Sequence, residues 1–412
     1  MNDPEVERPS DRASSRHESP RTDASGGARL TAASDGARSA DGIRARLTRR
    51  RVTIAGTVLL GLGLLVALRE IDVGAVAADV SRADPMLLAL AVGVYAASWP
   101  LRGRRYGDVL AAMGHRHGTG FLTNVVFLSQ TANLALPARA GDAVRAYALN
   151  VRRDVPYPAG FASLAVERVF DLLTIALFAG VAIAGLAVGG YGGPLEIAGE
   201  ASGARTALLA AGGVSVATVA VAGAIVATTH SSWRAGIGPD LRTRVAGYPR
   251  LRAGVDAALG FWRDVQVVAR NPRAIVAIGA GSLVVWALDV LTAMFVLAAL
   301  DSGLAPGQLL AVGTLAVSVG NLAKVLPLSQ GGLGLYEAAF TALVVGLTPV
   351  GASTALAAAI VDHALKNAVT LVGGCGAVAS LEVSLSRAAD DGRSAAAASR
   401  GAATAEPEPG SD

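Results

Sequence analysis

Charged and aromatic residues are both scarce in this 412-residue sequence. Charged residues make up 17% of it and aromatic residues 5%, whereas a soluble domain carries about 25% charged residues. So few polar groups cannot cover the surface of an ordinary soluble enzyme. The single cysteine, Cys375, has no partner within the chain, which excludes an intrachain disulfide and a cysteine-based zinc cluster.

The motifs of common catalytic sites are absent as well. The sequence contains no GxxxxGKS or GxxxxGKT, no GxSxG, no HExxH and no CxxC. We therefore expect a protein that is not an enzyme and that uses no cofactor or metal ion. A membrane-embedded transferase with Asp171 or Glu337 as its base is a weaker alternative, because no donor site is recognisable. The net charge of +4 comes from cations that lie between apolar runs, so we expect no nucleic-acid partner.

The sequence instead has a series of apolar runs of membrane length, since about 20 residues cross the hydrocarbon core as a helix. Two further stretches, 119–137 and 308–347, are interrupted by Pro, Gly and polar residues. Interrupted backbone survives at membrane depth only inside protein or beside a wet cavity. The sequence thus predicts an all-α polytopic membrane protein with two re-entrant, broken-helix hairpins and about six full spans, at 52–69, 84–101, 161–188, 204–228, 274–300 and 353–378.

Arginines between these runs predict the orientation, because cytoplasmic loops carry an excess of positive charge. Five arginines between residues 44 and 51 favour a cytoplasmic N-terminus, and eight arginines place the 229–273 loop on the same side. That loop is amphipathic at 251–268, so we expect it along the membrane surface. We predict a multi-pass protein of the cell membrane with both termini cytoplasmic. Its expected parts are a disordered tail at 1–50, a membrane domain at 51–380 and a disordered tail at 381–412.

The two interrupted stretches resemble each other, which suggests an internal repeat. The first contains NLALPARAG at 133–141, and the second contains NLAKVLPLSQGGLG at 321–334. Each is followed by a span with an acid, a base, two residues and an ionisable group, in ERVFD (167–171) and DHALK (362–366). Three full spans separate the hairpins, so the second unit enters from the opposite face. We predict an inverted repeat, typical of transporters, with units at about 119–188 and 308–378.

Ionisable side chains inside the apolar stretches are the candidate functional groups. A charge at a helix centre costs roughly 2.5–3.5 kcal/mol on insertion scales, so these groups should face one another or a hydrated cleft. Glu167 and Asp171 share a helix face, and Asp362 and Lys366 have the spacing of an intrahelical pair. The alternative is that these charges form ion pairs that only fix helix packing.

Guanidinium groups bind phosphate oxygens through paired hydrogen bonds, which makes the arginines of the first hairpin candidates for a lipid headgroup. Glycines after a proline indicate either a helix break that faces an anion or close helix packing. The predicted headgroup-binding residues are Arg139, Arg145, Lys324 and Lys366. The predicted charge-pairing or proton-carrying residues are Glu167, Arg168, Asp171, Glu337 and Asp362. The predicted helix-break residues are Pro137, Gly141, Pro327, Gly331, Gly332 and Gly334.

Four ordered blocks of the sequence resemble the lysylphosphatidylglycerol synthase transmembrane-region family, also described as the flippase-like domain of the multiple peptide resistance factor proteins. The blocks are LPARAGDAVRAY (136–147), FASLAVERVFDLLT (161–174), NLAKVLPLSQGGLGLYEAA (321–339) and IVDHALKNAVTL (360–371). The resemblance covers about residues 50–380 and implies a domain that moves a lipid or lipid-linked group between leaflets. The residues after 380 are too few for a soluble aminoacyl-transferase domain, so lysyl transfer is not expected.

The leading hypothesis is therefore a flippase-like protein that translocates or binds an anionic lipid or lipid-linked glycan. The alternative is a non-transporting scaffold for a glycosyltransferase or lipid-modifying enzyme, with the 229–273 loop as its interaction surface. The expected partners are membrane lipids, an anionic lipid or lipid-linked substrate, and in the alternative a glycosyltransferase or synthase.

Overall fold

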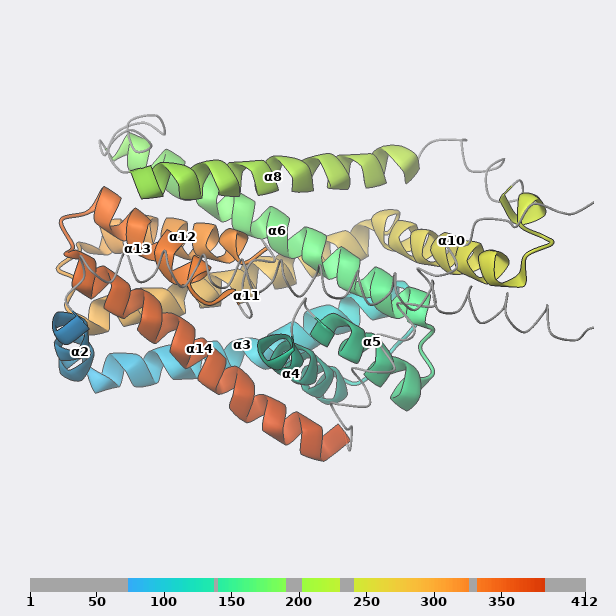
Figure 1. Ribbon diagram of the computed structural model, residues 1–412, viewed down its shortest axis with the longest axis horizontal. Helices are drawn as coiled ribbons and strands as arrows, with labels where there is room; N and C mark the ends of the chain where they lie inside the picture. The colour runs from blue at the N-terminus through green and yellow to red at the C-terminus, as the bar shows by residue number, and fades with distance from the viewer. Residues whose placement is uncertain (1–72, 137–139, 190–201, 230–240, 326–331, 382–412) are drawn as a thin grey trace, which may run out of the picture. The chain divides into compact units, whose positions relative to one another are not determined.

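A computed structural model describes residues 73–136, 140–189, 202–229, 241–325 and 332–381, and the regular structure in these ranges is helical, without strands (Figure 1). Six of the helices are long and apolar enough to cross a membrane. The chain is thus an all-helical, multi-pass membrane protein. Its helices are α2 (Val73–Arg82), α3 (Pro85–Ala112), α4 (Thr119–Ala135), α5 (Ala140–Arg153), α6 (Tyr157–Val188), α8 (Ser202–Thr229), α10 (Pro249–Ala269), α11 (Pro272–Ala299), α12 (Pro306–Ala323), α13 (Leu335–Leu347) and α14 (Ala352–Leu381).

Five of the predicted spans are long helices, namely α3, α6, α8, α11 and α14. The sixth predicted span, 52–69, and the two predicted tails lie outside the described residues. The sixth long helix is α12, which comes from the stretch predicted to be interrupted. One boundary was wrong: α3 does not end near residue 101 but continues to Ala112. The reason is that Arg105, inside this extension, is buried against carboxylates of another helix.

The helices that open the two halves, α3 and α11, begin in the same way. Asp84 caps α3 by accepting a hydrogen bond from the backbone N of Met86 at 2.7 Å. Asn271 caps α11 by accepting one from the backbone N of Ala274 at 3.1 Å. A proline follows each cap, where it fixes a helical φ and removes a backbone donor that would have no partner.

The second interrupted stretch, 308–347, forms a helical hairpin of α12 and α13. The prediction for the first stretch, 119–137, was wrong in its bounds, because residues 119–135 are the single helix α4 and the hairpin is completed by α5 from the segment that follows. Gly141 lies in the first turn of α5, and a methyl group added there would come 2.0 Å from the carbonyl oxygen of Ser129 on α4. Between α12 and α13, Gly332 and Gly334 have φ angles of +77° and +83°, which glycine adopts without steric cost. The predicted membrane re-entry of the hairpins stays a prediction.

The two halves pack reciprocally across the helix bundle. The α4 helix of the first hairpin packs against α14 of the second half, and α12 of the second hairpin packs against α6 of the first half. The opening helices α3 and α11 have the most extensive contact of all the helix pairs. Each half thus has the order opening helix, hairpin and long helix, although the inverted relation between the halves stays a prediction.

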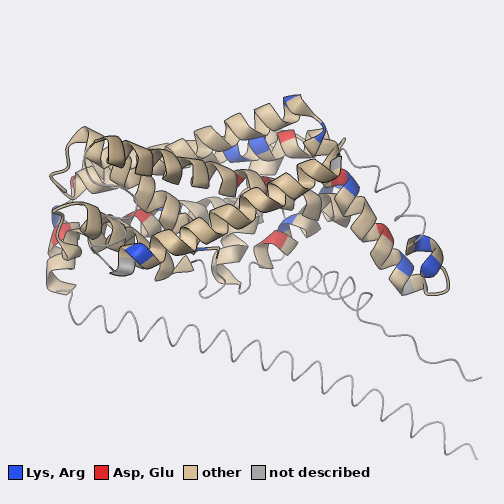
Figure 2. Cartoon of the chain, turned by 90° about the horizontal axis from the view of Figure 1, so that it is seen from above, with Lys and Arg blue, Asp and Glu red and all other residues tan. Residues whose placement is uncertain are grey.

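The predicted amphipathic stretch at 251–268 lies within helix α10. Its apolar residues Val265 and Val268 are buried against a cluster that includes Val109 of α3 and Val166 of α6. Figure 2 shows charged positions sparsely distributed along the membrane-length helices, with basic positions gathered around the turn before α10. This distribution gives α10 one face toward the bundle and leaves Arg252, Asp256 and Arg263 exposed.

Candidate functional site

Buried charged side chains form two connected clusters inside the helix bundle. The first, which we call the arginine cluster, consists of Arg105, Arg145, Glu167 and Asp171. Arg105 of α3 is 2% exposed, and its Nη2 donates to Glu167 Oε1 at 2.6 Å. Arg105 Nη1 donates to Asp171, and Arg145 Nη1 donates to the other oxygen of Glu167. The two arginines and two carboxylates have no net formal charge, which makes their burial tolerable.

Neighbouring polar and aromatic groups orient the arginine cluster. The indole Nε1 of Trp286 donates to Asp171 Oδ1 at 2.8 Å, and Arg105 Nη1 donates to Ser282 Oγ at 2.9 Å. The guanidinium carbon of Arg145 lies 4.8 Å from the centre of the Tyr106 ring, a cation–π distance. Within the part of the chain that the structure describes, Nε and Nη2 of Arg145 have no hydrogen-bond partner. This arginine thus retains donors for a further acceptor.

The second cluster, which we call the lysine cluster, consists of Asp289, Asp362, Lys366 and Tyr336. Lys366 Nζ lies 3.0 Å from Asp289 Oδ2 and 2.9 Å from Asp362 Oδ2. The hydroxyl of Tyr336 donates to Asp362 Oδ2 at 2.5 Å. Asp362 Oδ1 is buried without a hydrogen-bond partner among the described residues. The pairing of Asp362 with Lys366 is the one that their four-residue spacing suggests.

The second hairpin adds ionisable groups next to the lysine cluster. Glu337, in the first turn of α13, accepts from the backbone N of Gly334 at 2.7 Å and lies 2.6 Å from His363 Nδ1. Lys324, directly after α12, has its Nζ 4.1 Å from the centre of the Tyr336 ring. The N-terminus of α13 is therefore already occupied by the carboxylate of Glu337, which is the charge that a helix N-terminus favours.

The contact between α3 and α11 connects the two clusters. On α11, Trp286 reaches Asp171 of the arginine cluster, while Asp289, three residues later, holds Lys366 of the lysine cluster. On α3, Arg105 belongs to the arginine cluster, and Nη2 of Arg102 lies 3.7 Å from Asp289 Oδ1. A displacement of α3 relative to α11 would therefore alter both clusters together.

The structure gathers several of the predicted site residues in these clusters, namely Arg145, Glu167, Asp171, Lys324, Glu337, Asp362 and Lys366. Arg168 lies at the edge: its side chain is 33% exposed and its Nη2 is 3.3 Å from Asp142. Gly141, Gly332 and Gly334 lie at the turns of the two hairpins. Four further predicted residues, Pro137, Arg139, Pro327 and Gly331, lie outside the described residues.

Sequence reasoning missed Arg105 as a site residue, and it gave Asp289, in the predicted span at 274–300, only as a weaker candidate for a cavity residue. Arg105 follows Arg102 and Arg104, and this run is typical of a basic loop at the membrane surface. A usable signal is the apolar pattern that continues through Tyr106, Val109 and Leu110, which predicts more helix after the arginines. His363 was noticed only as part of the repeated charge pattern, and its partner Glu337 lies 26 residues away.

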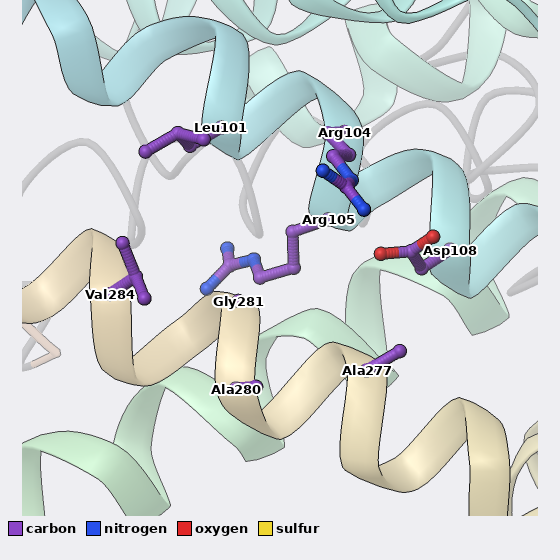
Figure 3. Close-up of a pocket in the computed structure, with 8 residues that line it drawn as sticks. All are labelled: Leu101, Arg104, Arg105, Asp108, Ala277, Ala280, Gly281 and Val284. Atoms are coloured by element: carbon purple, nitrogen blue, oxygen red, sulfur yellow. The ribbon is translucent and has the colours of Figure 1, made fainter.

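A groove lies on the surface between α3 and α11, directly above Arg105 (Figure 3). Its volume is about 280 Å³, and α11 contributes the small residues Ala277, Ala280 and Gly281 to its wall. A methyl group added at Gly281 would lie 3.0 Å from Cγ of Arg105. The absence of a side chain at Gly281 therefore leaves space for the Arg105 side chain to reach Glu167 and Asp171.

The family model described as lysylphosphatidylglycerol synthase TM region matches residues 53–374 of the chain. The chain belongs to this family. The match includes all the residues of both charge clusters and confirms the resemblance drawn from the four sequence blocks.

One curated relative is "Glycosyltransferase AglD" of Haloferax volcanii, which is 47% identical to the chain over 367 residues. This alignment covers 85% of the chain but 57% of the relative. The chain therefore spans little more than half the length of that protein.

Among the described residues no group of three or more His, Cys, Asp or Glu side chains is placed to hold a metal ion.

Proposed function

We propose that this protein binds an anionic lipid or lipid-linked glycan inside its helix bundle and moves it between the leaflets of the cell membrane, without catalysing a reaction. Both termini are cytoplasmic in this proposal. The observation that carries it is the pair of buried charge clusters that the contact between α3 and α11 connects. Ionisable groups at membrane depth are costly and mark substrate or ion pathways by default.

The clusters can exchange their internal ion pairs for contacts with a phosphate. Arg145, Lys324 and Lys366, together with Arg139, neutralise the phosphate of the headgroup, and Arg105 joins this set. In the empty protein the carboxylates of Glu167, Asp171 and Asp362 pair with these cations, and Glu337 pairs with His363. When the phosphate takes over the cations, the released carboxylates take up a coupling proton, so that no unpaired charge is left in the membrane.

The acyl or isoprenoid chains stay in the bilayer in this proposal. Only the headgroup crosses, through the polar interior between the two halves. The unpartnered Nε and Nη2 of Arg145 supply free donors for the phosphate inside the arginine cluster.

The test is lipid movement by purified protein in vesicles that contain fluorescently labelled phosphatidylglycerol, with dithionite quenching as the readout. Glu167→Gln combined with Lys366→Met removes one charge from each cluster and should abolish the protein-dependent movement. Arg244→Gln, at an exposed position before α10, is the matched control and should move lipid like the parent protein. Gel filtration and thermal unfolding establish whether each variant is folded. Normal lipid movement by a folded double variant would refute the assignment of these residues.

A second candidate function is an accessory membrane subunit for a glycosyltransferase. It is favoured by the printed name of the Haloferax volcanii relative and by the part of that relative that the chain does not span. Its interaction surface would be the basic segment before and along α10. Neutralising the exposed Arg244 and Arg252 should then abolish co-purification of a transferase, whereas a flippase in vesicles keeps its intrinsic rate.

A further inference from the structure

Two charged residues of α3 border the groove between α3 and α11 and have no partner there. Arg104 is exposed and Asp108 is partly exposed. Both line the groove, and neither forms a hydrogen bond or ion pair through its side chain with any described residue. They are four residues apart on one helix face, yet they do not pair with each other.

The depth of Arg104 and Asp108 along the membrane-spanning helix makes their lack of a side-chain partner among the described residues unusual. Arg104 precedes the end of α3 by eight residues, which is about 12 Å along a helix. The helix is 28 residues long, or about 42 Å, against a hydrocarbon core of about 30 Å. A helix of this length centred in the bilayer extends about 6 Å beyond the core at each end, which places Arg104 about 6 Å inside the hydrocarbon boundary. A charge at this depth is unfavourable unless a lipid or water satisfies it.

The rest of the groove is apolar and suits a hydrocarbon chain. Leu101 of α3 and Val284 of α11 line one end of the groove. The small side chains of Ala277 and Ala280 leave the space in it open along α11. Ala277, Ala280 and Val284 are exposed on α11. In a membrane-spanning helix such residues face lipid, so the occupant that reaches them is a lipid molecule.

We propose that this groove binds a phosphodiester lipid whose headgroup carries free hydroxyl groups. Arg104 holds the phosphate, Asp108 accepts hydrogen bonds from the hydroxyls, and the hydrocarbon chain lies along the α11 wall toward Val284. The proposal rests on the proposed function and defines its substrate class. It also gives an access route, because Arg105 of the arginine cluster crosses the groove at Gly281 (Figure 3).

The charge around the groove favours hydroxyls over an ammonium group as the partner of Asp108. From Arg102 to its end, α3 carries Arg102, Arg104 and Arg105 against Asp108 alone, and residues 241–273 at the same end of the bundle carry seven arginines against two aspartates. A cationic headgroup would approach this region against like charge, whereas a neutral hydroxyl has no such penalty. A carboxylate accepts hydrogen bonds from hydroxyls readily.

The test measures lipid retention by native mass spectrometry, on protein released from nanodiscs of phosphatidylcholine with one tenth of a probe lipid. The two anionic probes are phosphatidylglycerol, which has headgroup hydroxyls, and phosphatidylmethanol, a phosphodiester without them. A third probe is phosphatidylethanolamine, which has an ammonium group. Parent protein should retain phosphatidylglycerol most strongly. Arg104→Gln should lower retention of both anionic probes by at least about tenfold, since hydrogen bonds between charged groups contribute about 1.5–3 kcal/mol. Asp108→Asn should abolish the preference for phosphatidylglycerol.

Ala280→Leu fills the groove from an exposed position and should lower retention of both anionic probes. The matched controls are Ala220→Leu, an exposed alanine of α8, and Arg205→Gln, an exposed arginine of α8 outside the groove. Both should retain lipid like the parent protein.

Unchanged retention in Arg104→Gln and Ala280→Leu would overturn the groove as the site. Equal retention of the two anionic probes by the parent protein, or stronger retention of phosphatidylethanolamine, would overturn the hydroxyl-bearing class. Retention that depends on Arg104 in a protein that moves no lipid in vesicles would leave this inference standing and refute the proposed function.

Discussion

Replacing Lys366 by methionine should destabilise the protein strongly, because it removes the cation that lies between the buried carboxylates of Asp289 and Asp362. Lys366 Nζ is within 3.0 Å of Asp289 Oδ2 and 2.9 Å of Asp362 Oδ2, and its side chain is 7% exposed. Removing one partner of a buried ion pair leaves an uncompensated charge and typically costs about 3–5 kcal/mol. We therefore expect Lys366→Met to lower the free energy of unfolding by about that amount.

A double-mutant cycle with Asp289→Asn separates the ion pair from general packing effects. Asp289→Asn removes the anionic partner on α11 but keeps the shape of the side chain. If the two groups stabilise each other, the double variant should lose less than the sum of the two single losses, by about 1.5 kcal/mol or more. Asp362 keeps the hydrogen bond from Tyr336 in every variant, so the cycle reports on the contact across helices.

The assay is reversible unfolding in mixed micelles, followed by circular dichroism as the fraction of denaturing detergent rises. Arg263→Met on α10 is the control: its side chain is 78% exposed and lies 3.8 Å from Asp264, and an exposed pair of this kind contributes roughly 0–1 kcal/mol. A loss below about 1 kcal/mol for Lys366→Met, or strictly additive losses in the cycle, would refute the account of the lysine cluster as a mutually stabilising network.

Other substitutions test the hairpins, the cluster support and the surface helix. Gly141→Ala should lower the free energy of unfolding by about 1–3 kcal/mol, because the new methyl meets the α4 backbone, whereas Gly212→Ala in open space on α8 should be neutral or slightly stabilising. Trp286→Phe removes the donor to Asp171 and should cost about 1–3 kcal/mol in the same unfolding assay, with an unchanged value contradicting the hydrogen bond. Burial raises the pKa of Asp264 on α10, so the folded state holds its proton more tightly than the unfolded state. The hydrogen-exchange protection of α10, corrected for the intrinsic exchange rate at each pH, should therefore be highest at acidic pH and fall as pH rises through that raised pKa, a dependence that Asp264→Asn should remove.

The helical fold could be predicted because it depends on local properties of the chain. Apolar runs of 20 or more residues specify spans, and the positions of five of the long helices followed from them. The pairing of Asp362 with Lys366 followed from helix periodicity alone. The end of α3 could not be predicted in this way, since arginines at a helix end and arginines inside a helix look alike until their partners are known.

The partners of Arg105 depend on contacts between distant segments. Glu167 and Asp171 lie 62 and 66 residues farther along the chain, and no spacing rule connects them to α3. Asp289 has a comparable separation of 77 residues from Lys366. The groove likewise exists only because Gly281 and the alanines of α11 lie opposite α3.

The sequence by itself determined that this is a helical membrane protein, that its family is recognisable and that its two interrupted stretches are alike. Hydrophobicity, proline and glycine affect the backbone within a few residues, so the helices and their interruptions can be predicted from the sequence alone. The tertiary structure alone decided which charges meet, because a charge buried in a membrane is stable only beside a partner that helix packing delivers from elsewhere in the chain.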